Sequence, residues 1–322
     1  MTSNVSTSQI SRPGASRAQI VVAFAAVYVI WGSTYLTIHI AIETIPALLM
    51  SGARFILAGL LLLAFSHRPG APRERLTLIH WRSALVIGGC LLLFGNGGVA
   101  WGEQYLPSGF VALIIATVPL WMALFAPAFG GKWINWTAAV GIAVGLAGIV
   151  LLVRPGGAGA GHWQTLVVLM APLLWALGSL YARTAPSPSQ PLTAIAMEMI
   201  AGGVLLSIAG VAGGELGHVH LNTVSFASVA AFVYLILVGA LVGYVAYIWL
   251  LHHVSVTAAS TYAFVNPVVA VALGAIVLGE QVTMVTVVAA ALIIGAVVFL
   301  LVGQSRRTEP AVTLEMPVRD VA

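Results

Sequence analysis

Two charged residues lie well inside long apolar segments, where a charge needs a specific reason to be present. Arg54 lies within the apolar segment 46–66, and Glu198 lies within the segment 191–212. At the centre of a bilayer a charged side chain costs about 2.5–3.5 kcal/mol on insertion scales, so neither is expected to face lipid. We expect Glu198 to bind a proton or an amine, and Arg54 to bind a carboxylate or to serve as a counter-ion. A purely structural ion pair is the other interpretation.

Three more polar side chains accompany these charges. Glu103 follows the apolar segment 82–102, and Asn96 lies one helical repeat before it, so both are expected on one helix face. Glu103 could guard an outer vestibule as a third charged or coupling residue, or could simply be solvated. Asn96 and Asn266 are expected to be buried and must find partners. The Asn266 side chain could line a cavity or satisfy backbone groups next to Pro267.

Aromatic side chains recur at helical spacing in three apolar segments. Trp31 and Tyr35 are four residues apart, Tyr244 and Tyr247 are three apart, and Trp175 precedes Tyr181 in a segment of their own. Such stripes can line a binding site or can serve only for helix packing. The predicted pathway for a small molecule comprises seven residues: Trp31, Tyr35, Asn96, Trp175, Tyr181, Tyr244 and Asn266.

The composition shows which solvent surrounds these residues. Of 322 residues 60% are hydrophobic and only 7% are charged, with a mean hydropathy of +1.05. Soluble domains carry about 25% charged residues, so lipid must surround most of this chain. The pI near 9.5 does not indicate nucleic acid, because the basic residues lie between apolar segments instead of forming one basic face.

The apolar segments predict an all-α integral membrane protein. A helix needs about 20 mostly apolar residues to cross the hydrocarbon core. Ten such spans are predicted, at residues 19–38, 46–66, 82–102, 108–128, 134–153, 163–183, 191–212, 226–250, 256–278 and 283–302.

The distribution of basic residues predicts the orientation of these spans. With the N-terminus inside, eleven Lys and Arg residues fall on the inner side, and only Arg154 falls on the outer side. The positive-inside rule then predicts that both termini are cytoplasmic. No apolar core precedes Ala18, so we expect no cleavable signal peptide.

The chain repeats itself at an offset of 148 residues. Gly95 aligns with Gly243 and Pro119 with Pro267, and a Gly-Ser-x-Tyr motif begins at both Gly32 and Gly178. The halves, 19–155 and 156–302, hold five spans each, between an N-terminal tail 1–18 and a C-terminal tail 303–322. An odd repeat must insert upside down relative to its partner, and inverted repeats are typical of secondary transporters.

The two aligned prolines have two interpretations. Each removes a backbone hydrogen bond inside its span, 108–128 for Pro119 and 256–278 for Pro267. We predict a pair of symmetric hinges for alternating access. An inert kink that neighbouring helices tolerate is the alternative.

Several motifs resemble those of one transporter family. Trp31-Gly32-Ser33-Thr34-Tyr35, Ala116-Thr117-Val118-Pro119-Leu120 and Val265-Asn266-Pro267-Val268 are similar to motifs of the EamA family of the drug/metabolite transporter superfamily. The resemblance covers about residues 20–302. It implies ten helices in two EamA repeats, location in the bacterial cytoplasmic (inner) membrane, and export of amino acids or other small metabolites. One departure is Lys132, where the second half has the acidic Glu280.

Other function classes are disfavoured by missing motifs. No phosphate-cradling G-x-x-x-x-G-K-[ST] loop and no H-E-x-x-H motif occur, the only aspartate is Asp320, and the only cysteine is Cys90. We therefore expect no enzyme activity, no catalytic residue, no metal and no cofactor. The partners expected are a small-molecule substrate, a possible coupling proton and the lipid bilayer. Export of apolar or cationic drugs and a non-transporting sensor remain alternatives.

Overall fold

The computed structural model describes residues 16–66, 74–131, 133, 136–153, 163–254 and 261–305. The predictions for most of the two tails, for Lys132 and for the first residues of the span 256–278 lie outside the described residues. Every regular element of the described part is helical, which confirms the all-α prediction.

The first half contains nine helical elements in the described residues. They are α1 (Arg17–Ile42), α2 (Ala47–Ser66), α3 (Leu78–Gly88), the π-helix η1 (Gly89–Asn96), α4 (Gly97–Gly102), α5 (Ser108–Ile115), α6 (Val118–Phe125), the 3₁₀-helix η2 (Ala126–Phe129) and α7 (Trp136–Val153).

The second half contains eight helical elements in the described residues. They are α8 (Gln164–Ala182), α9 (Pro191–Ala212), the 3₁₀-helix η3 (Glu215–His218), α10 (Phe226–Tyr234), the π-helix η4 (Leu235–Val242), α11 (Gly243–His253), α13 (Tyr262–Val277) and α14 (Met284–Ser305).

Helical stretches within the described residues have the length and composition of membrane spans. Seven of them are long and apolar enough to cross a bilayer, and three more, at 138–153, 262–277 and 284–300, are apolar but shorter. Several boundaries differ from prediction. The first helix continues to Ile42 because the residues after 38 are still mainly apolar, and the third begins at Leu78 because Thr77 provides its N-cap.

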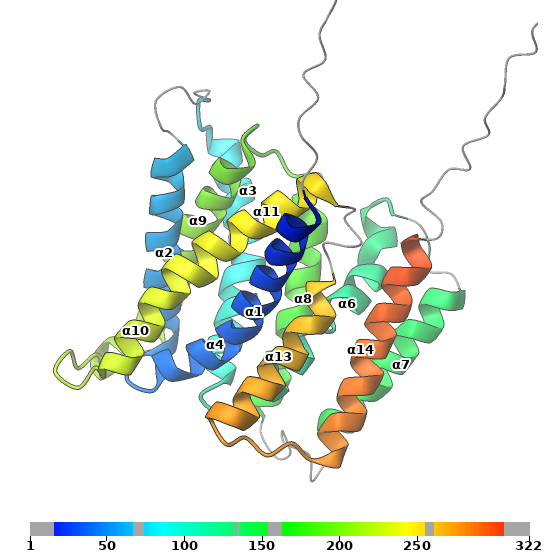
Figure 1. The fold of residues 1–322 in the computed structure, drawn as a ribbon. Helices are drawn as coiled ribbons and strands as arrows, with labels where there is room; N and C mark the ends of the chain where they lie inside the picture. Colours follow the sequence, from blue (N-terminus) through cyan, green and yellow to red (C-terminus); the bar gives the residue numbers. More distant parts are fainter. Residues whose placement is uncertain are drawn as a thin grey trace, which may run out of the picture.

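Helices from the two halves pack against each other in a reciprocal way (Figure 1). Helix α2 packs along α9, and α7 packs along α14 at one edge of the molecule. Helix α1 contacts α11 and α13, while α8 contacts η1 and α6. Each of these contacts has its counterpart when the elements of one half are exchanged for those of the other.

The interior is apolar and so is much of the exterior. The largest buried cluster combines residues of α1, α2, α4, α5, α7, α8 and α14, including Met50, Leu113 and Ile293. Large apolar side chains also point outward, for example Leu78, Phe226 and Ile276, which are 87%, 88% and 79% exposed. An exposed apolar surface of this kind fits a helix bundle that is surrounded by lipid.

The two prolines predicted to be equivalent occupy different helical settings. Pro119 follows a break at residues 116–117 and is the second residue of α6, where its missing N–H leaves no bond unmade. Pro267 lies inside the continuous helix α13. The two positions are therefore aligned in sequence but are not equivalent in geometry, because only the first coincides with a helix end.

Candidate functional site

Trp31 of α1 lies against the junction between η4 and α11. Its indole Nε1 donates a hydrogen bond to the carbonyl oxygen of Gly239, at 3.2 Å. A Cβ atom at Gly243 would lie 3.0 Å from Trp31 Cδ1 and closer still to Nε1. The indole can occupy this place because residue 243 has no side chain.

Three tyrosines surround the Trp31 ring. Its centroid lies 5.9 Å from that of Tyr244, 5.2 Å from that of Tyr247 and 4.9 Å from that of Tyr262. Tyr247 and Tyr262 also meet edge to face, with their centroids 5.5 Å apart. We call Trp31, Tyr244, Tyr247 and Tyr262 the aromatic cluster. It joins α1, α11 and α13, and aromatic pairs at these distances stabilise one another.

Arg54 of α2 approaches the same stretch of η4. Its side chain is 5% exposed, and its Nη2 lies 3.8 Å from the place of a Cβ at Gly239. The guanidinium carbon lies 4.6 Å from the centroid of the Phe55 ring. The buried Nε of Arg54 has no hydrogen-bond partner among the described residues. An unpaired buried guanidinium is costly and is therefore a candidate ligand for an anion.

Glu198 of α9 approaches the aromatic cluster from another direction. Its carboxylate is close enough to Tyr244 to act on the tyrosine hydroxyl electrostatically. The structure records no hydrogen bond or ion pair between Glu198 and Arg54, so the two predicted central charges do not pair directly. Gly239, beside Arg54, and Tyr244, near Glu198, belong to the same long helix, so both charges approach the stretch of helix against which Trp31 packs.

A similar tryptophan contact occurs in the other half of the molecule. Trp175 of α8 lies against Gly95 of η1, where a Cβ would be 2.6 Å from the Trp175 ring. The neighbouring Asn96 donates from Nδ2 to the carbonyl oxygen of Leu91, at 3.4 Å. Tyr181 lies in the last turn of α8 and is half-buried. The predicted pathway therefore contains two separate tryptophan contacts, one at Trp31 and one at Trp175.

Glu103 is more buried than expected, whereas the expected burial of Asn266 is confirmed. Glu103 is 1% exposed, and neither carboxyl oxygen has a hydrogen-bond partner among the described residues. It acts electrostatically on Tyr35, the remaining predicted residue of α1. The alternative in which Glu103 is simply solvated is therefore wrong for this conformation. Asn266 is 8% exposed, and its Oδ1 has no hydrogen-bond partner among the described residues.

Sequence analysis missed part of the site. It predicted no role for Tyr262 or Gly239, and it noted Gly243 only in the alignment of the two halves. The 148-residue repeat offered a usable signal, because it aligns Gly243 with Gly95 and so marks two positions that accept a tryptophan ring.

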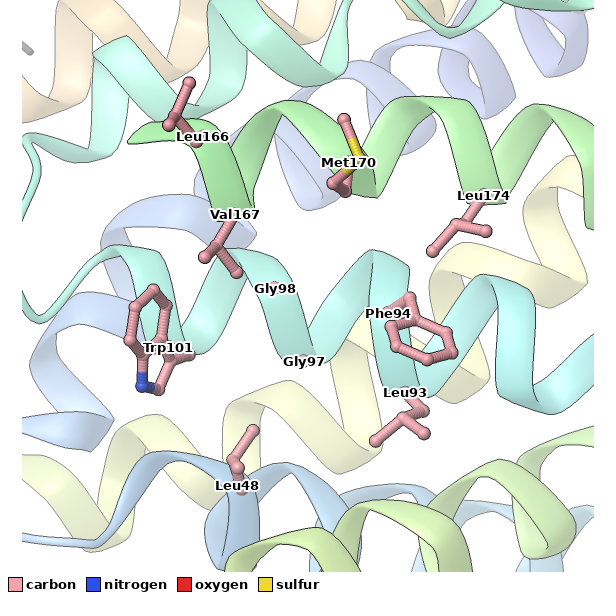
Figure 2. Close-up of a pocket in the computed structure, with 10 residues that line it drawn as sticks. All are labelled: Leu48, Leu93, Phe94, Gly97, Gly98, Trp101, Leu166, Val167, Met170 and Leu174. Atoms are coloured by element: carbon pink, nitrogen blue, oxygen red, sulfur yellow. The ribbon is translucent and has the colours of Figure 1, made fainter. Parts of the chain in front are cut away.

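A separate pocket of about 580 Å³ lies between α2, α4 and α8 (Figure 2). Its lining is apolar, and none of the predicted site residues contributes to it: Leu48, Leu93, Phe94, Gly97, Gly98, Trp101, Leu166, Val167, Met170 and Leu174. Phe94 and Leu166 are 51% and 64% exposed, so the pocket opens to the surroundings of the bundle. The lining has no charged side chain, and the Trp101 indole is its only polar side chain, so the pocket offers no partner for a charged molecule.

Comparison with known proteins supports the membrane-transport interpretation. The family model described as "EamA-like transporter family" matches residues 18–154 and again residues 162–302. The chain is 40% identical over 282 residues to the uncharacterized inner membrane transporter YedA of Escherichia coli K12, covering 87% of this chain and 89% of that protein.

More distant relatives share the same extent. A probable amino-acid metabolite efflux pump of Escherichia coli K12 is 23% identical over 272 residues, covering 80% of this chain and 86% of that protein. A solved crystal structure that is 17% identical covers 92% of this chain and all of its own, with a TM-score of 0.59. That likeness concerns the fold alone. Because the family model matches both halves and the relative YedA matches nearly the whole length, this chain belongs to the EamA-like transporter family.

Proposed function

We propose that this protein is a secondary transporter that exports small amino acids or related zwitterionic metabolites across the cytoplasmic membrane by alternating access. One observation carries the proposal: Arg54 and Glu198, neither of which has a charged partner among the described residues, both approach the helix stretch against which Trp31 packs. A zwitterion carries a carboxylate and an ammonium group a few bonds apart. Each of these groups would neutralise one of the two protein charges.

Within this site each residue has a distinct role. Arg54 binds the substrate carboxylate, since a guanidinium offers several donors to one anion. Glu198 binds the ammonium group, and Trp31 with Tyr244 provides faces on which a cation or an apolar side chain can lie. Tyr35, Asn96, Trp175, Tyr181 and Asn266 line the rest of the pathway.

The architecture that we propose is ten transmembrane helices in two inverted repeats, 19–155 and 156–302, with both termini cytoplasmic. The reciprocal packing of α2 with α9, and of α7 with α14, supports it, because elements related by a two-fold axis in the membrane plane meet at that axis. The break before Pro119 and the proline inside α13 are the proposed flexible points during alternation.

The chemistry at Glu198 also admits a second substrate class. An apolar or cationic drug could bind the aromatic cluster through Glu198 alone and would leave Arg54 unpaired. The unpaired guanidinium favours the zwitterion. A non-transporting sensor could share the same site, and only net flux distinguishes it from a transporter.

The test compares metabolites in the medium of cells that express the wild type, Glu198→Gln or Arg54→Met at matched membrane levels. Mass spectrometry should find one class of amino-acid-like compound accumulating outside only with the wild type. A loss in Glu198→Gln but not in Arg54→Met would favour cationic substrates. Equal accumulation in all three strains would remove both charges from the binding site, and no accumulation with the wild type would count against export.

A further inference from the structure

The outer end of the bundle contains a carboxyl group that nothing in the proposed binding site explains. Glu103 immediately follows α4, and both of its oxygens are inaccessible and without hydrogen bonds to described residues. Buried polar groups in folded proteins are nearly always hydrogen-bonded, and an ionised carboxylate without partners is especially costly. The enclosed conformation therefore requires Glu103 to be neutral.

A second carboxylate lies nearby and is fully engaged. Glu280, between α13 and α14, accepts hydrogen bonds from the backbone N–H groups of Ser108 at 2.6 Å and Gly109 at 3.0 Å. These amides belong to the first turn of α5, so Glu280 caps that helix from the other half of the chain. Glu280 also acts electrostatically on Glu103. Glu280 therefore has two backbone donors, whereas Glu103 has none among the described residues, so Glu103 is the carboxyl whose burial requires a proton.

None of the other described groups around Glu103 forms a hydrogen bond with its carboxyl. Tyr35 of α1 is the nearest titratable side chain on that helix, and His39 lies one turn further, with its Nδ1 buried and unpaired. Helix α8 presents Val168 to Gly102 and carries no titratable side chain at this level. The Ser108 hydroxyl is also buried without a partner. Burial is the main cause, and the charge of Glu280 the second cause, that raises the pKa of Glu103 well above its ordinary value.

We propose that Glu103 is a proton-binding site that controls the outer end of the bundle: the closed outer end requires the protonated carboxyl, and opening releases the proton to external water. This inference rests on the proposed function, because it assigns a proton step to the opening that alternating access requires. It separates the proton site from Glu198, which the proposed function reserves for the substrate amine.

The direction of the pH effect follows from linkage. The closed state holds a proton that the open, hydrated state loses, so the closed state binds more protons. Between the ordinary pKa of a glutamate and its raised value in the closed state, each unit of pH increase raises the ratio of open to closed molecules about tenfold. Alkaline medium therefore opens the outer end and acidic medium closes it.

The test measures access to the outer end without any substrate. The single native cysteine is removed as Cys90→Ala, and Leu106→Cys places one thiol between Glu103 and Ser108, at a position that is 2% exposed. The purified full-length protein in nanodiscs is labelled with a membrane-impermeant maleimide over a range of pH. The same labelling is done with Glu103→Gln added, and with Glu43→Gln, an exposed glutamate at the end of α1, as the matched control.

The rate of labelling should rise with pH in all three proteins. The rise in the parent and in Glu43→Gln should exceed the rise in Glu103→Gln by up to about tenfold per pH unit. The Glu103→Gln profile corrects for ionisation of the thiol itself. Identical profiles with and without Glu103→Gln would overturn the proposal. Infrared spectroscopy gives an independent check. At neutral pH the parent should show a carboxylic acid band that Glu103→Gln removes. Absence of such a band in the parent would also overturn the proposal. Neither result depends on transport, so failure of the proposed function would be seen separately, in the metabolite experiment.

Discussion

The molecule contains two tryptophans that pack on glycines in the same way but in different chemical surroundings. Trp31 lies against Gly243, just after the π-helix η4, and Trp175 lies against Gly95, within the π-helix η1. Around Trp31 there are three tyrosines and the guanidinium of Arg54. Near Trp175 the polar neighbour is Asn96, whose amide is occupied by the carbonyl oxygen of Leu91.

This difference shows that the repeat duplicates the scaffold and not the chemistry. Adding the 148-residue offset to Arg54 leads to Gly202, and subtracting it from Glu198 leads to Met50. Neither central charge therefore has a charged counterpart in the other half. A symmetric fold can alternate between two equivalent conformations, while an asymmetric site can bind an asymmetric molecule in one orientation.

The largest effect is expected at Arg54, which exists in one half only. Arg54→Met keeps the apolar stem of the side chain and removes the guanidinium, so the substrate carboxylate would enter the site unpaired. A lost partner of this kind costs about 2–5 kcal/mol, which corresponds to a fall in affinity of about thirtyfold or more. The concentration dependence of export, measured in proteoliposomes with the exported compound, checks this value.

Two controls sharpen the comparison. Arg54→Lys keeps a positive charge but loses the planar set of donors, so we expect partial loss. Gly202→Ala changes the aligned position of the other half; its Cβ would lie 2.7 Å from Leu92 Cβ, so it should lower stability but leave substrate affinity unchanged. Unchanged affinity in Arg54→Met would mean that the guanidinium serves only the packing of α2 against η4.

An intermediate effect is expected at the two glycines. Gly243→Ala forces the Trp31 indole away from η4, because the added Cβ would overlap it, and this breaks the hydrogen bond to Gly239. Gly95→Ala displaces Trp175 in the same way. Overpacking of this kind costs about 1–3 kcal/mol of stability, so both variants should unfold at lower temperature.

Only Gly243→Ala should also reduce substrate affinity, because the proposed substrate site with Arg54 and Glu198 includes Trp31. Thermal unfolding and transport measured on the same preparations separate the two effects. Equal losses of transport in both variants would show that the two tryptophans serve the cycle symmetrically, and the asymmetric site would then need revision.

The sequence was sufficient for the parts of the structure that depend on periodic apolar composition. The helical segments, the central position of Arg54 and Glu198 and the alignment of Gly95 with Gly243 all follow from local patterns. The convergence of Arg54 and Trp31 on Gly239 could not be predicted, because it depends on how α1 and α2 cross η4. Sequence spacing fixes which side of a helix a residue occupies but not which neighbouring helix meets it.

The role of Glu280 shows the same limit. Its position after Gly279 was notable in the sequence, and the missing acidic partner at Lys132 was visible too. Only the fold shows that the Glu280 carboxylate caps α5, a helix more than 170 residues earlier in the chain. A capping group supplied by a distant loop leaves no local signature, since the usual sequence signals for caps lie within the same helix turn.

The smallest effects are expected at two further carboxylates that bind helix starts across the halves. Glu215 accepts hydrogen bonds from the N–H groups of Leu48 at 3.1 Å and Leu49 at 2.9 Å, at the start of α2. Glu74 accepts from the N–H and hydroxyl of Ser189 at 2.7 and 2.9 Å, just before α9. Loss of such a cap typically costs about 0.5–2 kcal/mol, and we expect Glu215→Gln to fall in that range. Glu74→Gln should cost less, because water screens its exposed site.

The effect of Glu74 should also depend on pH in a defined direction. Hydrogen bonds from Ser189 lower the pKa of Glu74, so its contribution to stability is present above the unfolded pKa and is lost as the pH falls through the folded value. Thermal unfolding of the wild type and Glu74→Gln should therefore differ at neutral pH and converge in acid. A difference that persists undiminished in acid would mean that Glu74 acts by packing alone. In that case only the interaction of Glu215 with the start of α2 would depend on charge, and the interaction of Glu74 before α9 would not.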